Sequence, residues 1–152
     1  MGAGAPYTEI DGALELSTDP ARLDRTLIHE FLSEQSYWAT GVPRAVIERA
    51  IEHSLCFGVY RQGTQVAFAR VVTDHATFAY LADVFVQPAY RGSGIAKWML
   101  GTIVNHPDLQ GLRRFILATR DAHGLYARFG FAPLANPGRF LERFAPDPYG
   151  AR

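Results

Sequence analysis

The sequence contains little cysteine, no excess of either charge and no long apolar run. Its one cysteine, Cys56, cannot form a disulfide within the chain and is expected to be a small buried residue rather than a nucleophile. Fifteen basic and fifteen acidic residues cancel, so no overall field favours nucleic acid or an anionic membrane. No apolar run reaches about eighteen residues, and no charged-then-apolar leader is present. We therefore expect a cytoplasmic protein that binds neither nucleic acid nor membrane.

The chain also lacks the residue spacing of a metal site. Apart from the one discussed below, its histidines are scattered at positions 29, 53, 75 and 106, and none stands at a ligand spacing from another. We expect no metal. The length of 152 residues predicts a single domain. Residues 1–12 are rich in glycine and alanine and are expected to be a flexible start, which places the domain at 13–146.

Apolar periodicity predicts four helices. They are expected after Asp19-Pro20, after Pro43, over 95–103, and from Asp121 as N-cap through Arg128. In the first helix Leu23, Leu27 and Phe31 recur every four residues, as one buried face requires. Gly130 is expected to end the last helix in the left-handed conformation.

Alternating apolar residues and turn signals predict the strands. They are expected at 14–16, 56–60, 66–72, 78–86, 115–119, 131–134 and 139–144. The second to fourth of these are joined by short turns, which indicates an antiparallel meander.

The apolar segment 84–86 leads directly into a glycine turn and a helix start. Gly92 and Gly94 carry no Cβ, so successive backbone N–H groups can converge on an anion, and the dipole of the following helix points the same way. This order predicts a pyrophosphate site. The alternative is a tight connection that binds nothing.

Two known phosphate-binding motifs do not fit this turn. A P-loop needs G-x-x-x-x-G-K-[ST], which the sequence does not contain. The dinucleotide fingerprint needs a third small residue where this chain has Lys97, and an acidic residue where it has Arg113 and Arg114. Neither motif explains the turn.

The pattern that remains is R-x-x-G-x-A, spelled Arg91-Gly92-Ser93-Gly94-Ile95-Ala96. It resembles the coenzyme A pyrophosphate loop of the GNAT superfamily of N-acetyltransferases. As in that family, Pro88 and Tyr90 precede the arginine, and Tyr126 precedes the pair Gly130-Phe131 further along the chain. The resemblance covers roughly positions 78–132.

The resemblance implies a fold and a ligand. The fold is α/β with mixed α+β character, the GNAT acyl-CoA N-acyltransferase fold, with a twisted mixed sheet of about six or seven strands and helices on both faces. Acetyl-CoA, the implied co-substrate, lies where the strands on either side of the glycine turn splay apart in a V. The resemblance implies these cofactor contacts: the backbone of Val84, Phe85 and Val86 for pantetheine, amides of Arg91, Gly92, Ser93, Gly94, Ile95 and Ala96 for the pyrophosphate, and Asp121 where the family often has Asn.

Tyr126 is the strongest candidate for the acid that protonates the departing thiolate. Its phenol, with a reference pKa of about 10, can protonate or hydrogen-bond a thiolate whose conjugate acid has a pKa near 8.5. The family usually keeps its general acid at this position before Gly-Phe. The alternative role for Tyr126 is packing, with its hydroxyl in water.

Two residues are candidates for the base that receives the amine proton. Asp83 interrupts an apolar strand, and an acid inside a sheet usually needs a partner or a function. The alternative is an ion pair with a neighbour such as Arg70. His123 titrates in the useful range and lies one helical turn before Tyr126, but it could equally face solvent.

The adjacent aromatics Tyr37 and Trp38 lie in a polar connection between the first two helices. They are candidates for the acceptor site, as an apolar wall or as a cation-π seat for an ammonium group. The alternative is a hydrophobic plug that holds the loop on the core.

The sequence therefore predicts an N-acetyltransferase. It would move an acetyl group from acetyl-CoA to a primary amine of a small molecule by direct attack in a ternary complex. Two alternatives stay open: a catalytically silent acyl-CoA-binding sensor or interaction module, and an acetyltransferase for protein or peptide amines. Edge strands near the C-terminus suggest a homodimer.

Overall fold

The computed structural model describes residues 4–150. Six strands form one mixed sheet in sequential order, which agrees with the predicted α/β fold: β1 Thr8–Asp11, β2 Leu14–Ser17, β3 Leu55–Arg61, β4 Thr64–Thr73, β5 Phe78–Val86 and β6 Arg114–Leu117. Neighbours from β1 to β5 are antiparallel, and β6 joins β5 in parallel. The prediction of a flexible segment over residues 1–12 is wrong for residues 8–11, because these form the strand β1 of the sheet. Residues 1–3 lie outside the described residues.

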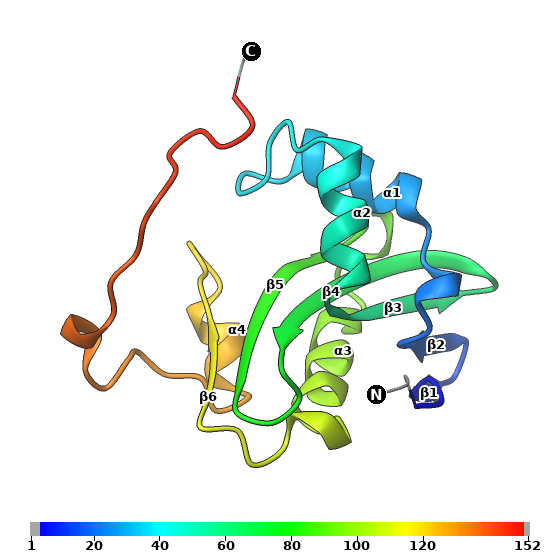
Figure 1. The fold of residues 1–152 in the computed structure, drawn as a ribbon. Coiled ribbons are helices and arrows are strands. Elements are labelled where there is room, and N and C mark those ends of the chain that lie inside the picture. Colours follow the sequence, from blue (N-terminus) through cyan, green and yellow to red (C-terminus); the bar gives the residue numbers. More distant parts are fainter. Residues whose placement is uncertain (1–3, 151–152) are drawn as a thin grey trace.

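Helices cover both faces of the sheet, as predicted (Figure 1). On one face, α1 (Arg25–Glu30) and α2 (Arg44–Glu52) pack on a core that includes Phe68 and Phe85. On the other, α3 (Ile95–Val104) packs on a second core, which α4 (His123–Ala127) partly covers.

Two predicted helix starts are wrong. Asp19 caps only a short 3₁₀ turn, and α1 begins after Asp24, whose side chain accepts a hydrogen bond from the N–H of Leu27. Asp121 does not cap α4, because the N-cap residue is Ala122. The prediction for Gly130 is confirmed by its φ of +91° just after the helix.

The strands β5 and β6 separate after a short paired stretch. Their register pairs 78–81 with 114–117, and from Ala82 onward β5 continues without β6 beside it. A register shift between β4 and β5 accompanies a left-handed Asp83, with φ of +54°, so the strand bends there. The predicted V between the strands is therefore present (Figure 1).

The strands predicted at 131–134 and 139–144 are wrong. Of the residues that the structure describes, none after Leu117 belongs to a strand. The segment 131–150 is called the C-terminal tail below. It runs away from β6 and returns to the face of the sheet that α1 and α2 cover, where Tyr149 packs on the core (Figure 1). Alternating apolar residues form a strand only where a neighbouring strand supplies hydrogen bonds. This tail meets β6 through side chains, with Phe131 against Phe115 and Phe140 against Arg114, but it does not join the sheet. Leu141 and Phe144 are consequently exposed, at 97% and 73%.

Candidate active site

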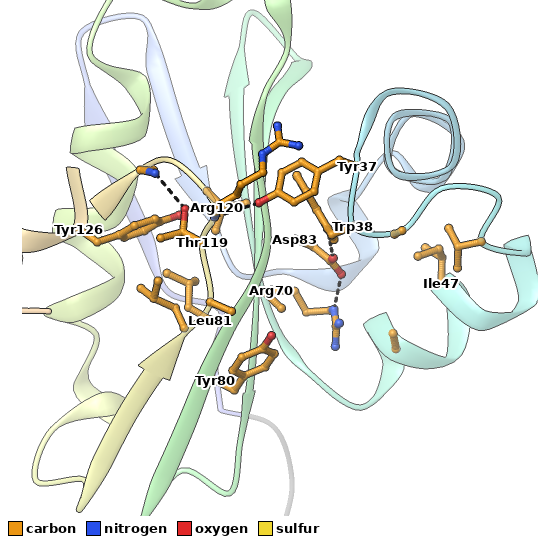
Figure 2. Close-up of a pocket in the computed structure, with 18 of the residues that line it drawn as sticks. Tyr37, Trp38, Ile47, Arg70, Tyr80, Leu81, Asp83, Thr119, Arg120 and Tyr126 are labelled. Carbon is orange, nitrogen blue, oxygen red and sulfur yellow. Dashed lines mark hydrogen bonds and ion pairs between the residues drawn. The ribbon is translucent and has the colours of Figure 1, made fainter. Parts of the chain in front are cut away.

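A cleft of about 670 Å³ opens where β5 and β6 diverge (Figure 2). One side is formed by the ends of the two strands and by α4, and the other by the loop before α2 and by α2 itself. The residues that line it are Tyr37, Trp38, Ala39, Val42, Val46, Ile47, Ala50, Arg70, Tyr80–Val84, Leu117–Ala122, Tyr126 and Tyr149. The cleft therefore collects residues from several elements that are far apart in the sequence, from Tyr37 to Tyr149.

Tyr126 lies on α4 and lines this cleft, as its predicted role requires. Its ring is half-buried and meets Phe131 edge to face, with 6.1 Å between ring centroids. Burial, with a smaller contribution from nearby Tyr37, raises the pKa of Tyr126. The phenol is thus kept protonated, which suits a proton or hydrogen-bond donor.

Asp83 also lines the cleft, but it is not a free carboxylate. Its Oδ2 accepts a hydrogen bond from Nε of Arg70 at 2.8 Å, and its Oδ1 accepts one from the indole Nε1 of Trp38 at 2.8 Å. Its side chain is 9% exposed. The ion-pair alternative is therefore the observed arrangement, and the carboxylate is held in one position by two donors from different elements.

Tyr37 and Trp38 reach across the cleft instead of plugging the core. The Tyr37 hydroxyl accepts a hydrogen bond from the backbone N–H of Arg120 at 3.2 Å, and the Arg120 guanidinium lies 3.8 Å from the centre of the Tyr37 ring. Trp38 meets Tyr37 edge to face and binds Asp83. The two aromatics therefore connect the loop before α2 to both arms of the V (Figure 2).

A second cavity of about 300 Å³ lies at the glycine turn. Gly92 and Gly94 have φ of +86° and +85°, and a Cβ added to either would meet no heavy atom within 4 Å. Open space thus lies beside both residues at the N-terminus of α3. Nε of Arg91 donates a hydrogen bond to the carbonyl oxygen of Val86 at 2.9 Å, which holds this exposed arginine at the cavity.

The two cavities are lined by neighbouring residues of the same two elements, β5 and α4. On β5, Val84 lines the cleft and Val86 lines the glycine cavity, and on α4 Tyr126 and Leu125 do the same. One extended ligand could therefore lie along both.

The other predicted residues divide into two groups. Asp121, Ile95 and Ala96 line one of the cavities, whereas Ser93 does not, and its hydroxyl donates to the carbonyl of Tyr90 at 3.1 Å. Phe85 is buried and stacks on Phe31 at 4.0 Å. His123 is exposed and lies outside both cavity linings, so the structure does not bring it to Asp83.

Sequence reasoning missed several residues of the site. Lys97, which served only to exclude a dinucleotide motif, lines the glycine cavity from the first turn of α3. Its position after the turn was the available signal, because a cation there suits a phosphate. Arg120, Tyr80 and Tyr149 carried no such signal, since only the tertiary fold brings them to the cleft.

Cys56 lies outside both linings and is buried. Burial raises the pKa of its thiol to about 12, so it remains protonated and unreactive. Within residues 4–150, no cluster of three or more His, Cys, Asp or Glu side chains could hold a metal ion. None of the described helices is both long and apolar enough to span a membrane.

Comparisons with known proteins agree with the resemblance noted from the sequence. Residues 25–131 match the model of the acetyltransferase (GNAT) family. A crystal structure from Xanthomonas campestris pv. campestris, provisionally described as a GNAT-family acetyltransferase, is 55% identical, with a TM-score of 0.89 over 91% of this chain and 97% of that one. A provisionally named acetyltransferase of Gibberella zeae is 37% identical over 81% of each chain.

A third protein shares the fold alone. This predicted acetyltransferase of Clostridium acetobutylicum, solved with acetyl-CoA, is 18% identical. It has a TM-score of 0.53 over 82% of this chain and 86% of that one.

Proposed function

The chain belongs to the GNAT family of acetyltransferases, and from that premise we propose that it transfers an acetyl group from acetyl-CoA to a primary amine of a small molecule. The main support for this proposal is the unpaired edge of β5 beside the glycine turn. Among the described residues, 82–86 have no strand partner on the β6 side, and they lead directly to Gly92 and Gly94. An extended chain that ends in a pyrophosphate matches this order of an open strand edge and an anion cradle.

Acetyl-CoA fits the residues that are present. We propose that the backbone of Val84 to Val86 pairs with pantetheine and that amides from Gly92 to Ala96 hold the pyrophosphate. Arg91 and Lys97, both at the glycine cavity, would supply positive charge to the phosphates. The related fold solved with acetyl-CoA supports this choice of donor. When bound, acetyl-CoA supplies the thioester whose carbonyl carbon the amine attacks.

We propose that Tyr126 protonates or hydrogen-bonds the departing thiolate and that the amine attacks directly. Direct attack is supported by Cys56, the one thiol of the chain, which is buried outside the cleft and cannot carry an acyl group there. The acceptor amine must lose a proton, because an aliphatic amine is less than about one part in a thousand neutral at pH 7. Asp83 is proposed to orient that amine and accept its proton.

Two measurements test the proposed function: the binding of acetyl-CoA, and then its turnover with added amines. Titration calorimetry with acetyl-CoA, using ATP and NAD as controls, is expected to show micromolar binding of the coenzyme only, and thiol release with added amines is expected to follow. Binding without turnover on any amine would indicate the sensor alternative. Faster acetylation of peptides than of free amines would indicate the protein acetyltransferase alternative.

We further propose that the enzyme is a cytoplasmic homodimer. The strand β6 is an edge of the sheet, and Leu141 in the C-terminal tail is almost completely exposed. A second copy could cover both features at once. The free thiol of Cys56 is consistent with a reducing compartment.

Light scattering coupled to size-exclusion chromatography is expected to give about twice the 16.8 kDa of one chain. Leu141→Glu is expected to yield monomers, because a charge would be buried in the interface. Ile10→Glu is the matched control, since Ile10 is 74% exposed at the opposite edge of the sheet. Dissociation by Ile10→Glu alone would place the interface at β1 and contradict the role of the tail.

A further inference from the structure

We propose that the acceptor is a primary amine on an aromatic or branched alkyl group that carries no phosphate or carboxylate. This inference rests on the proposed function, because it concerns the acceptor end of the same cleft. It follows from the apolar side chains and the paired charges that line this cleft.

The acceptor wall is apolar. It consists of the small and branched side chains of α2 and the loop before it: Ala39, Val42, Val46, Ile47 and Ala50. Val46 is 39% exposed although it is a large apolar residue. Two aromatic residues, Tyr80 and Tyr149, also line this cleft, and Figure 2 shows Tyr80 and Ile47 on either side of Arg70. Such a wall favours an apolar substituent because both surfaces leave water on binding.

The charges that line the cleft are already paired. Of the described residues, four charged ones belong to its lining, and they form two ion pairs: Arg70 with Asp83 at 2.8 Å, and Arg120 with Asp121 at 3.7 Å. The Arg120 guanidinium also lies on the Tyr37 ring. Because these two arginines and two aspartates cancel, the lining offers no net positive charge to a phosphate or carboxylate on the acceptor, and no net negative charge to the second ammonium group of a polyamine.

The same site retains a place for one amino group. An ionised carboxylate has about four lone-pair positions. Asp83 uses two of these, toward Arg70 and Trp38. A third donor can therefore bind Asp83, beside the Trp38 indole that already contacts this carboxylate. An amine held there would direct its substituent toward the α2 wall.

Steady-state acetylation of a panel of amines by the wild-type enzyme tests the inference. We expect kcat/KM for 2-phenylethylamine and 3-methylbutylamine to exceed that for glucosamine 6-phosphate, alanine and spermidine by at least about tenfold. Equal or better use of the charged acceptors would overturn the inference and leave acetyl transfer intact. If acetyl-CoA binds but no amine is acetylated, the proposed function fails, and this inference fails with it.

The variant Val46→Arg tests whether the acceptor binds against the apolar wall. It is expected to lower kcat/KM for 2-phenylethylamine by about tenfold, to improve alanine relative to 2-phenylethylamine, and to leave the KM for acetyl-CoA unchanged. Ala45→Arg is the control, because it adds the same charge to the neighbouring exposed position of α2, outside the cleft lining. Unchanged selectivity in Val46→Arg, or the same loss in Ala45→Arg, would overturn the inference.

Discussion

Gly94→Glu is expected to weaken acetyl-CoA binding by at least about 100-fold, or about 2.7 kcal/mol, in titration calorimetry. The substitution puts a side chain and a negative charge into the open space beside the N-terminus of α3, where the pyrophosphate is proposed to lie. Loss of two charge-assisted hydrogen bonds, at about 1.5–3 kcal/mol each, accounts for an effect of this size. Apart from the residue itself and its two chain neighbours, no protein atom lies within 4 Å of the new Cβ, so the fold itself is not obstructed.

The variant also carries a backbone cost that a control must match. Gly94 has φ of +85°, where an L-residue costs about 1–2 kcal/mol. Gly63→Glu has nearly the same φ, +80°, and equally open surroundings in the β3–β4 turn, away from both cavities. Both variants should lose similar stability, and only Gly94→Glu should lose coenzyme. Equal affinity in the two variants would reduce the glycine turn to a structural connection.

Tyr126→Phe is expected to lower kcat by about 100-fold while the Kd for acetyl-CoA changes by less than about threefold. The substitution removes the proposed proton donor and keeps the ring that packs at 6.1 Å from Phe131. Because burial raises the pKa of Tyr126, the wild-type phenol stays protonated at least to its ordinary value of about 10. Wild-type kcat should therefore show no loss from this group below about pH 9.5.

Tyr60→Phe is the matched control for this variant. Tyr60 is a buried tyrosine whose pKa burial raises to about 12, as burial also raises that of half-buried Tyr126, but Tyr60 lies outside both cavity linings. Its hydroxyl has no hydrogen-bond partner among the described residues. Removing that hydroxyl should leave kcat unchanged. A kcat for Tyr126→Phe within about threefold of wild type would assign Tyr126 to packing.

Much of the fold was predictable because local patterns agree with the tertiary structure. The meander β3–β5 follows from alternating residues and short turns, and β5 ends at Val86 as predicted. The two strands predicted in the C-terminal tail are wrong for a general reason. A strand forms only when it is paired with another strand, and the alternation of apolar residues in 131–144 does not show whether a partner strand is available. The strand β1 was missed because its polar composition hides pairing with β2.

The candidate site was predictable where its residues are close in sequence. The glycine turn and the strand before it are contiguous, so the second cavity could be placed from the sequence. His123 was grouped with Tyr126 by helical spacing, yet α4 turns it to solvent. The contact of Tyr37 with Arg120 joins residues far apart in the chain and left no local pattern to detect.

The sequence alone determined the family, the mixed α/β fold and the glycine turn before α3, because glycines, strand pattern and helix start act over a few neighbouring residues. Only the tertiary structure decided the state of Asp83 and the character of the acceptor wall. Arg70 and Trp38 reach Asp83 from separate elements, and α2 lines the same cleft, so the ion pair and the apolar wall depend on long-range packing. Such packing is set by how the layers meet and not by any one segment.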